Sequence, residues 1–332
     1  METNQTETIQ TKTLQNATGK IDYPLTNDYM FRAVLQKNTR VLKGLSAALL
    51  HLRAEDILSA DILNSIELGE SLNARTFVLD VKVLLNNSIV INLEMQVINQ
   101  AFWKDRSLSY LCSIFSNLEK GDNFSQVMPA YHIGIVDFSP FPDYPEFYAT
   151  HKMMNVKKHY IYNDKFTLNV LDLNRIELAT DEDKAYQIDY WARLFKAKTW
   201  EDLKMIAQRN EIFRETCDAV FTLNQDDKVR YWCEAVEEGK RIERTYQAEI
   251  AEKNNTIETV TEERDAAISV IAEQKTAIAE RDSTIAEKDS VIAEQKTAIA
   301  EKDSAMAEKD SLIAEKDAII ARLMAEMEKS GK

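Results

Sequence analysis

The chain has 332 residues, 45% of them hydrophobic, so it can bury one sizeable core or two smaller ones and is not disordered as a whole. Its 41 basic and 55 acidic residues give a formal net charge of −14, so the average surface repels phosphate and a nucleic-acid partner would need a local basic patch. Three widely spaced cysteines without a CxxC pair, and four histidines without metal-ligand spacing, argue against zinc and indicate a reducing compartment.

The N-terminal residues 1–22 are rich in Thr, Asn and Gln and show no apolar period. This composition predicts a flexible arm and is unlike a signal peptide. No apolar run in the chain approaches the roughly 20 residues that a helix needs to cross a bilayer. We therefore expect a cytoplasmic protein without a membrane partner.

Two helices are predicted next. From Asn27, apolar residues recur at helical spacing in NDYMFRAVLQKNTRVLKGLSAALLHL, with an interruption near residues 37–39. Asn27 or Asp28 can cap the first of these helices. Residues 61–74 are then expected to form an extended segment and a loop.

A hairpin is predicted for FVLDVKVLLNNSIVINLEMQ, residues 77–96, with two apolar strands around an Asn-Asn turn. Side chains alternate between faces along a strand, so Asp80 shares a face with Lys82, and Glu94 shares one with Gln96. Both apolar rows lie on one side only if paired residue numbers sum to an even value. A sum of 174 sets Asp80 opposite Glu94 and requires a three-residue turn or a bulge, because a two-residue loop would mix the faces.

Helices and strands alternate beyond the hairpin. A helix is predicted over residues 106–121, ending at Gly121, and strands are predicted over 130–138 and, as a pair, within 158–173. The side chains expected on the inner side of the helix are Leu108, Leu111, Cys112, Phe115 and Leu118. The interleaving indicates an α/β or α+β domain with a mixed central sheet, followed by helices over 181–239.

The C-terminal region repeats every seven residues, and IAEQKTAIAE occurs unchanged at positions 271 and 292. Its Ala-, Glu- and Lys-rich sequence predicts a helix of about 80 residues and about 120 Å. The apolar positions in one register are Ile271, Ile278, Ile285, Ile292, Ile299, Met306, Ile313 and Ile320. Position d of this register is mostly Lys, Arg or Gln, so both a self-associating coiled coil and a solvated single helix remain open.

The predicted hairpin carries two acidic residues that could bind a metal ion. Asp80 and Glu94, roughly 5 Å apart if directly opposed, would repel each other, and a divalent cation would reverse that repulsion. Oxygen ligands without a nearby thiolate or imidazole favour Mg²⁺ or Mn²⁺. The spacing alone also allows two ordinary polar residues on a solvated face, with Asp80 paired to Lys82 or Arg75.

The order of short motifs adds a resemblance. NDYMFRAVL, then LDVKV, then INLEMQ, then RSLSY and EKG, is similar to the PD-(D/E)XK nuclease-like family of recombination-promoting nucleases and transposases (Rpn type). The likeness is close over residues 25–175 and looser to about 240, and it does not extend to the heptad repeats. It implies a restriction-endonuclease-like α/β core, with a mixed central sheet flanked by helices, and metal-dependent cleavage of DNA.

The resemblance also implies roles for individual residues. It makes Asp80 and Glu94 metal ligands, and it places Gln96 where the ExK motif has lysine. In the leading hypothesis the Met95 carbonyl completes the ligand set. A glutamine amide can orient water but supplies no charge and cannot act as a base. Slow or tightly regulated cleavage is therefore expected.

Five further residues are secondary candidates. Asp28 could reach the metal, although N-capping is an alternative, and Arg32 could clamp a phosphate, although it could equally be a solvated surface residue. Arg106 and Tyr110 lie four apart on one helical face and could both point toward the site. Lys82 shares the carboxylate face and could partly replace the missing lysine.

These expectations combine into four segments. Residues 1–22 form the arm, 23–178 the nuclease-like domain, 179–240 a helical region and 241–332 a long helix that could join copies of the chain. The leading hypothesis is a Mg²⁺-dependent DNA endonuclease whose cuts promote recombination or transposon-like exchange. The alternatives are a catalytically weak or inactive nuclease fold that binds DNA or protein, and a structural protein whose tail carries the function.

Overall fold

The computed structural model describes residues 13–64, 80–99, 102–116 and 123–330. Its contacts divide the chain into two units, Met1–Gln247 and Ala248–Lys332.

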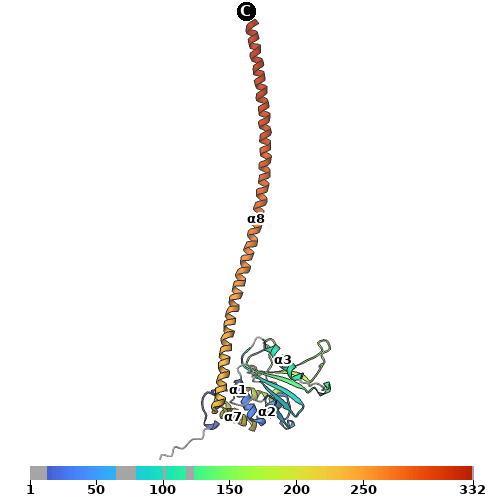
Figure 1. Cartoon of the computed structure of the whole chain (residues 1–332), viewed down its shortest axis with the longest axis vertical. Helices are drawn as coiled ribbons and strands as arrows, with labels where there is room; N and C mark the ends of the chain where they lie inside the picture. Colours follow the sequence, from blue (N-terminus) through green and yellow to red (C-terminus); the bar gives the residue numbers. More distant parts are fainter. Residues whose placement is uncertain (1–12, 65–79, 100–101, 117–122, 331–332) are drawn as a thin grey trace, which may run out of the picture. The chain divides into compact units, whose positions relative to one another are not determined.

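A mixed six-stranded sheet lies at the centre of the first unit (Figure 1). Its strands are β1 (Ala60–Ile62), β2 (Val81–Leu85), β3 (Ile89–Gln96), β4 (Ala130–Val136), β5 (Tyr148–Lys152) and β6 (Phe166–Asp172), in the order β1-β2-β3-β4-β6-β5. Strands β3, β4 and β6 are parallel, and the other neighbours are antiparallel. The predicted mixed sheet is confirmed.

Eight α-helices and four short 3-10 segments are assigned in the described part of the chain. The helices are α1 (Asp28–Lys37), α2 (Thr39–Leu49), α3 (Trp103–Phe115), α4 (Asp181–Ala185), α5 (Ile188–Lys196), α6 (Trp200–Ala207), α7 (Glu211–Asn224) and α8 (Asp227–Ser330). The 3-10 segments are Leu14–Asn16, Ala54–Asp56, Phe124–Gln126 and Ile176–Leu178.

The predicted interruption between the first two helices is confirmed. The Asn27 side chain caps α1 by accepting from the Met30 backbone N–H, and the Asn38 side chain caps α2 by accepting from the N–H groups of Arg40 and Val41. A second cap directly after α1 starts a new helix in a new direction, which explains the break.

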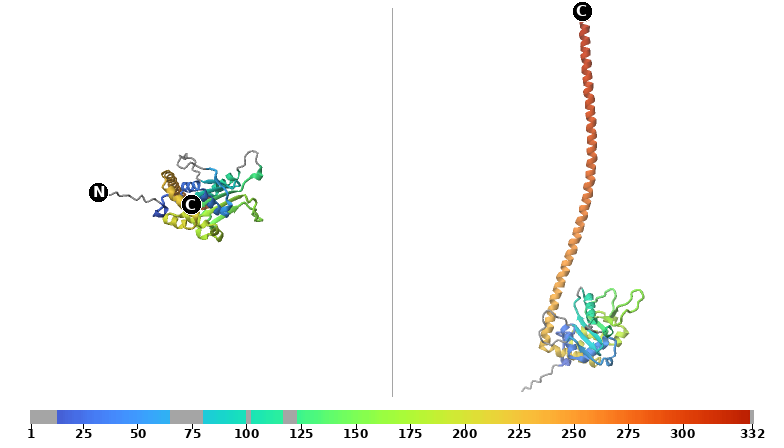
Figure 2. Two further views of the ribbon diagram at one scale, coloured as in Figure 1. Left: turned by 90° about the horizontal axis from the view of Figure 1, so that it is seen from below. Right: turned by 45° about the vertical axis from the view of Figure 1, so that its right-hand side comes forward.

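The two faces of the sheet are covered differently (Figures 1 and 2). Helices α1, α2, α5 and α7 and the first turns of α8 build the larger core on one face, where Val83, Ile91 and Ile133 are fully buried. Helix α3 covers the other face, where Leu111 and Ile114 pack against the sheet. Helices that follow residue 181 thus share one core with the sheet.

The register of the hairpin confirms the parity prediction. Val81 pairs with Leu93, Val83 with Ile91 and Leu85 with Ile89, so every pair sums to 174. The turn spans the three residues 86–88, as predicted, and Asn86 and Asn87 adopt φ values of 49° and 53°. Asparagine tolerates this left-handed conformation better than most residues. Residues 77–79, expected in the first strand, lie outside the described residues.

Helix α3 differs from its prediction. It ends at Phe115, and its buried residues are Trp103, Ser107, Leu111 and Ile114. Leu108 is 48% exposed and Cys112 is also exposed, so placing them inside was wrong. Trp103, which precedes the predicted start, sets the buried stripe at spacings of four, four and three. The predicted positions Leu118 and Gly121 lie outside the described residues.

The predicted strand pair within residues 158–173 is only half correct. Strand β6 begins at Phe166, but its antiparallel neighbour is β5, residues 148–152. Residues 153–164 contain a single bridge between Met154 and Ile161. Strand β5 lies at the sheet edge with Thr150, His151 and Lys152 exposed, so its sequence lacks the apolar alternation that marks a strand.

The second unit continues α8 through the heptad repeats, as predicted for a long C-terminal helix. The apolar residues of the repeat are half-exposed; Ile285, for example, is 56% exposed and Ile292 is 47% exposed. No helix in the described ranges is both long enough and apolar enough to span a bilayer.

Candidate active site

The hairpin places the two predicted carboxylates together. Asp80 immediately precedes β2, and Glu94 lies on β3. Continuing the observed register by one residue beyond the Val81–Leu93 pair sets Asp80 opposite Glu94. They are 5% and 7% exposed, so two acidic groups are buried side by side on the sheet face that α3 covers.

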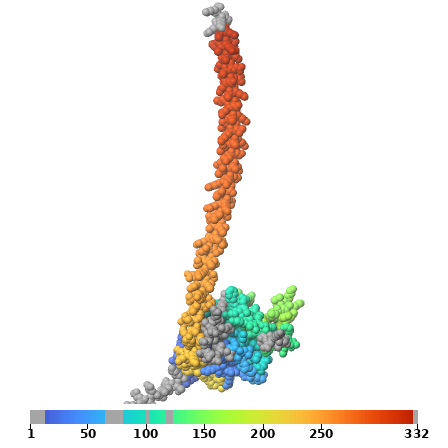
Figure 3. All heavy atoms as spheres, in the orientation of Figure 1, coloured from blue at the N-terminus to red at the C-terminus, as the bar shows by residue number. Residues whose placement is uncertain are grey.

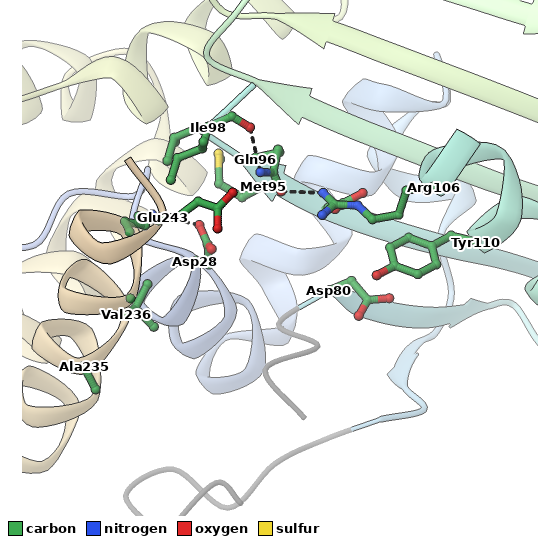
Figure 4. A pocket seen from close by; sticks show the side chains of 14 residues that line it. Asp28, Asp80, Met95, Gln96, Ile98, Arg106, Tyr110, Ala235, Val236 and Glu243 are labelled. Atoms are coloured by element: carbon green, nitrogen blue, oxygen red, sulfur yellow. Dashed lines mark hydrogen bonds and ion pairs between the residues drawn. The ribbon is translucent and has the colours of Figure 1, made fainter. Parts of the chain in front are cut away.

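Arg106 joins Glu94 to Gln96. Its Nη2 atom lies 2.5 Å from Glu94 Oε1 and 2.5 Å from Gln96 Oε1, and the Gln96 amide donates to the Ile98 carbonyl at 2.8 Å (Figure 4). A charge-assisted hydrogen bond to a buried carboxylate is among the stronger polar contacts. A guanidinium from α3 therefore brings positive charge to the position where the motif lacks lysine.

His132 on β4 touches the other oxygen of Glu94. Its ring is fully buried, and Nε2 lies 3.4 Å from Glu94 Oε2. Asn92 Nδ2 lies 3.1 Å from His132 Nδ1, and an amide nitrogen can only donate, so Nδ1 accepts. The contact of Nε2 with Glu94 Oε2 is within ion-pair distance but is not a hydrogen bond. The Tyr110 ring packs 5.9 Å from the imidazole.

Sequence reasoning missed His132 because it reaches the site through parallel pairing. The sequence shows only that Asn92 shares a strand face with Glu94. The pairing of β3 with β4, which places Asn92 beside His132, is seen in the structure alone. Parallel strands are joined by long connections, so their register is not visible in a local pattern.

Arg32 does not lie where a phosphate clamp was expected. It is fully buried, and its guanidinium donates to the Asp80 carbonyl at 2.5 Å and to the Asn64 carbonyl. The solvated alternative is equally excluded by this burial. Arg32 instead holds the backbone at Asp80 in place through these two hydrogen bonds.

Asp28 meets a residue that the sequence analysis did not single out. Lys240 on α8 is 8% exposed, and its Nζ lies 3.1 Å from Asp28 Oδ1 and 3.0 Å from the Thr26 carbonyl. Burial raises the pKa of Asp28, and the Lys240 charge opposes that rise. The available signal was a lysine that continues the buried stripe of Val229, Cys233 and Val236.

A cleft of about 310 Å³ connects these groups. Figure 4 shows Asp28, Val236 and Glu243 on one side of it and Arg106 and Tyr110 on the other. The lining residues are Asp28, Asp80, Glu94, Met95, Gln96, Val97, Ile98, Arg106, Tyr110, Ala235, Val236, Gly239, Lys240 and Glu243. As far as the structure describes the chain, Arg32 and Lys82 are not among them, although Lys82 lowers the pKa of Asp80 electrostatically.

The oxygen atoms of the cleft fit a hard divalent cation. Burial raises the pKa of Asp80, and the charge of Glu94 adds to the rise. Within the described ranges, Asp80 Oδ1 and Glu94 Oε2 are buried without a hydrogen-bond partner. Three or more His, Cys, Asp or Glu side chains placed so that they could hold a metal ion together do not occur in those ranges. Two carboxylates with the Met95 carbonyl and water suit Mg²⁺ or Mn²⁺, which retain several waters.

The sequence profile of the PD-(D/E)XK nuclease family transposases matches residues 25–280. The chain belongs to this family. Comparison with curated proteins and with solved structures gave no significant match.

Membership of the family confirms the predicted resemblance and the predicted restriction-endonuclease-like fold class. The match continues into α8 as far as residue 280. The expectation that the family likeness ends at about residue 240, before the heptad repeats, was therefore wrong. This agrees with the structure, in which Lys240 and Glu243 of α8 line the cleft. Nucleases of this superfamily generally use divalent metals, typically Mg²⁺.

Proposed function

We propose that the chain is a metal-dependent DNA endonuclease that hydrolyses phosphodiester bonds in the cleft of Asp80, Glu94 and Gln96. The pair of adjacent buried carboxylates, each with an oxygen that accepts no hydrogen bond from the described residues, carries this proposal. Membership of a transposase family supports DNA as the substrate, and cuts made in it would promote recombination or transposon-like exchange.

Asp80 and Glu94 would hold the cation, with the Met95 carbonyl as a further candidate ligand. When bound, Mg²⁺ or Mn²⁺ supplies Lewis-acid stabilisation of the phosphate and activates the attacking water. Gln96 is fixed at both ends, because its nitrogen donates to Ile98 and its oxygen accepts from Arg106. One N–H and one lone pair of the amide remain to orient that water.

Arg106 and Lys240 supply the positive charge that Gln96 lacks. Arg106 contacts Gln96 directly, and Lys240 lines the same cleft. Fixed cations next to a phosphate stabilise the negative charge that grows in its transition state. We assign to these two residues the compensating role that the sequence suggested for Lys82.

Plasmid nicking tests the proposal. Wild-type protein should nick supercoiled DNA with Mg²⁺ or Mn²⁺ and not with EDTA, and Asp80→Ala should reduce the rate by about a hundredfold or more, because it removes a ligand. Asp61→Ala, which changes an exposed aspartate on the neighbouring strand β1, is the matched control and should cut like wild type. Equal nicking by Asp80→Ala would contradict the assignment.

The absence of lysine at Gln96 gives one rival function some support, namely an inactive nuclease fold that binds DNA or protein. Calorimetric titration with Mn²⁺ separates the two proposals. An endonuclease should bind the ion and lose that binding in Asp80→Ala, whereas a scaffold that binds no metal should give the same flat titration for both proteins.

A further inference from the structure

A basic, aromatic segment stands out in this acidic chain. The last residue of β5 and the connection to β6, residues 152–165 (the finger), read KMMNVKKHYIYNDK. It holds four lysines and one acidic residue, whereas the whole chain carries a net charge of −14. A polyanion approaching this protein would therefore meet a locally favourable charge at the finger.

The finger has a defined backbone. Asn155 N–H donates to the Tyr160 carbonyl at 2.9 Å, and Tyr162 N–H donates to the Met153 carbonyl at 2.9 Å. At the tip, the Asn155 side chain accepts from the N–H groups of the two lysines that follow, at 3.0 and 2.9 Å. The result is a short ribbon that projects from the body of the first unit (yellow-green in Figures 1 and 3).

Large side chains on the finger face solvent. Tyr160 is 55% exposed and Tyr162 is 73% exposed, and residues two apart in an extended segment point to the same side. Both tip lysines, Lys157 and Lys158, are exposed as well. Large apolar side chains exposed together on one short segment, Val156 at 83% among them, make the finger a candidate contact site for another molecule.

We propose that the finger holds a DNA strand, with Lys157 and Lys158 on phosphates and Tyr160 and Tyr162 stacked on unpaired bases. This inference rests on the proposed function for the identity of the substrate. Open aromatic faces beside lysines are the arrangement that binds single-stranded nucleic acid, because a duplex already stacks its bases internally. A partner recognised through apolar contacts alone would leave the lysines at the tip without a role.

The finger lies within reach of the cleft. Ile161, Tyr162 and Lys165 share a shallow groove with Phe115, the last residue of α3. Arg106 lies nine residues earlier on the same helix, which corresponds to about 14 Å along its axis. A single strand of only a few nucleotides is long enough to span that distance.

Fluorescence anisotropy of a labelled 30-nucleotide single strand, with the full chain in EDTA, tests the inference without cleavage. Lys157→Ala/Lys158→Ala should weaken binding and reduce the slope of log affinity against log salt by about 1.4, at about 0.7 per lost phosphate contact. Tyr160→Ala/Tyr162→Ala should weaken single-strand binding by about fivefold or more for each stacked base and affect duplex binding less.

Lys184→Ala/Lys198→Ala, which changes two exposed lysines outside the finger, is the matched control and should bind like wild type. Circular dichroism melting should show that all variants fold, because the altered side chains are exposed. Unchanged affinity in both finger variants, or no DNA binding by wild type at low salt, would overturn the inference. So would a change in molecular mass without a change in DNA affinity, since that would make the finger a protein contact.

The two proposals can fail separately. If finger variants lose DNA binding but Asp80→Ala still cuts, only the proposed active site is wrong. If cleavage depends on Asp80 but the finger variants bind DNA normally, only the role of the finger is wrong.

Discussion

Arg106 neutralises a carboxylate that the fold has removed from water. Glu94 is 7% exposed and receives the guanidinium at 2.5 Å, and the His132 ring lies 3.4 Å from its other oxygen. Removing one partner of a buried ion pair costs far more than the net contribution of the pair, because the remaining charge stays buried. Arg106 thus contributes both to the stability of the hairpin and to the proposed active site.

We predict that Arg106→Ala lowers the free energy of unfolding by about 1–3 kcal/mol, less than for a fully buried pair because Arg106 is partly exposed. Cleavage should fall by at least tenfold, since a charge-assisted contact is lost beside Gln96. Chemical denaturation and plasmid nicking measure the two effects. Arg53→Ala breaks a fully exposed pair with Asp56 and should change neither; if Arg106→Ala behaved like this control, the proposed role would be wrong.

At the residue scale, the sequence was informative where the contacts are local. Strand alternation and parity placed Asp80 opposite Glu94, because both lie within one hairpin. His132 and Lys240 were missed because they come from distant segments: Asn92 and His132 are 40 residues apart, and Thr26 and Lys240 are 214 apart. A single sequence carries no pattern that reports such contacts.

At the element scale, the position of α3 depends on a close approach to β4. A Cβ atom added at Gly134 would lie 2.6 Å from Cζ2 of Trp103, the first residue of α3, and that ring is itself buried. Glycine therefore lets the helix that carries Arg106 and Tyr110 seat against the sheet.

Gly134→Ala should destabilise the protein by about 1–3 kcal/mol through overpacking and reduce cleavage by displacing α3. Gly239→Ala is the matched control for stability, since its new Cβ would meet no described atom within 4 Å and it lies inside helix α8. Alanine there should stabilise the fold by about 0.5–1 kcal/mol. Urea denaturation of both variants checks the pair, and a neutral Gly134→Ala would show that α3 is not seated by this contact.

Elements were predictable where the local apolar pattern is clear. The two N-terminal helices show apolar residues at helical spacing, and β4 is a short, β-branched apolar run that is buried on both faces. Strand β5 was missed because an edge strand with polar, exposed residues has no alternation to detect. The inner face of α3 was misjudged because the deciding residue, Trp103, lies before the part of the sequence that looked helical.

At the scale of the whole molecule, we expect the first unit to fold without the second. In the described part of the chain, the cores of the sheet and helices draw all their residues from positions before 248, and residues 248–327 of α8 are exposed apart from the half-buried Thr261. We propose that the half-exposed isoleucines of residues 248–332 join copies of the chain. The register of that seam, with charged residues at most d positions, makes the association weak along most of its length.

Light scattering should then give a multiple of 38.1 kDa for the full chain, and the mass of one chain for a truncation after Gln247. The truncated protein should keep its melting temperature and its nicking activity. Ile285→Asp/Ile292→Asp in the full chain should also give single chains, because it breaks the apolar seam. A full chain that stays monomeric at high concentration would leave the solvated single helix as the correct description.

The near-identity of the heptads has a consequence for how this helix changes over evolutionary time. A stretch of almost identical units of seven residues can gain or lose whole units. Each unit changes the helix by about 10 Å and returns the isoleucines to the same side, so the reading frame and the seam both survive. We therefore expect close relatives of this chain to differ in length by whole heptads while their cleft residues stay fixed.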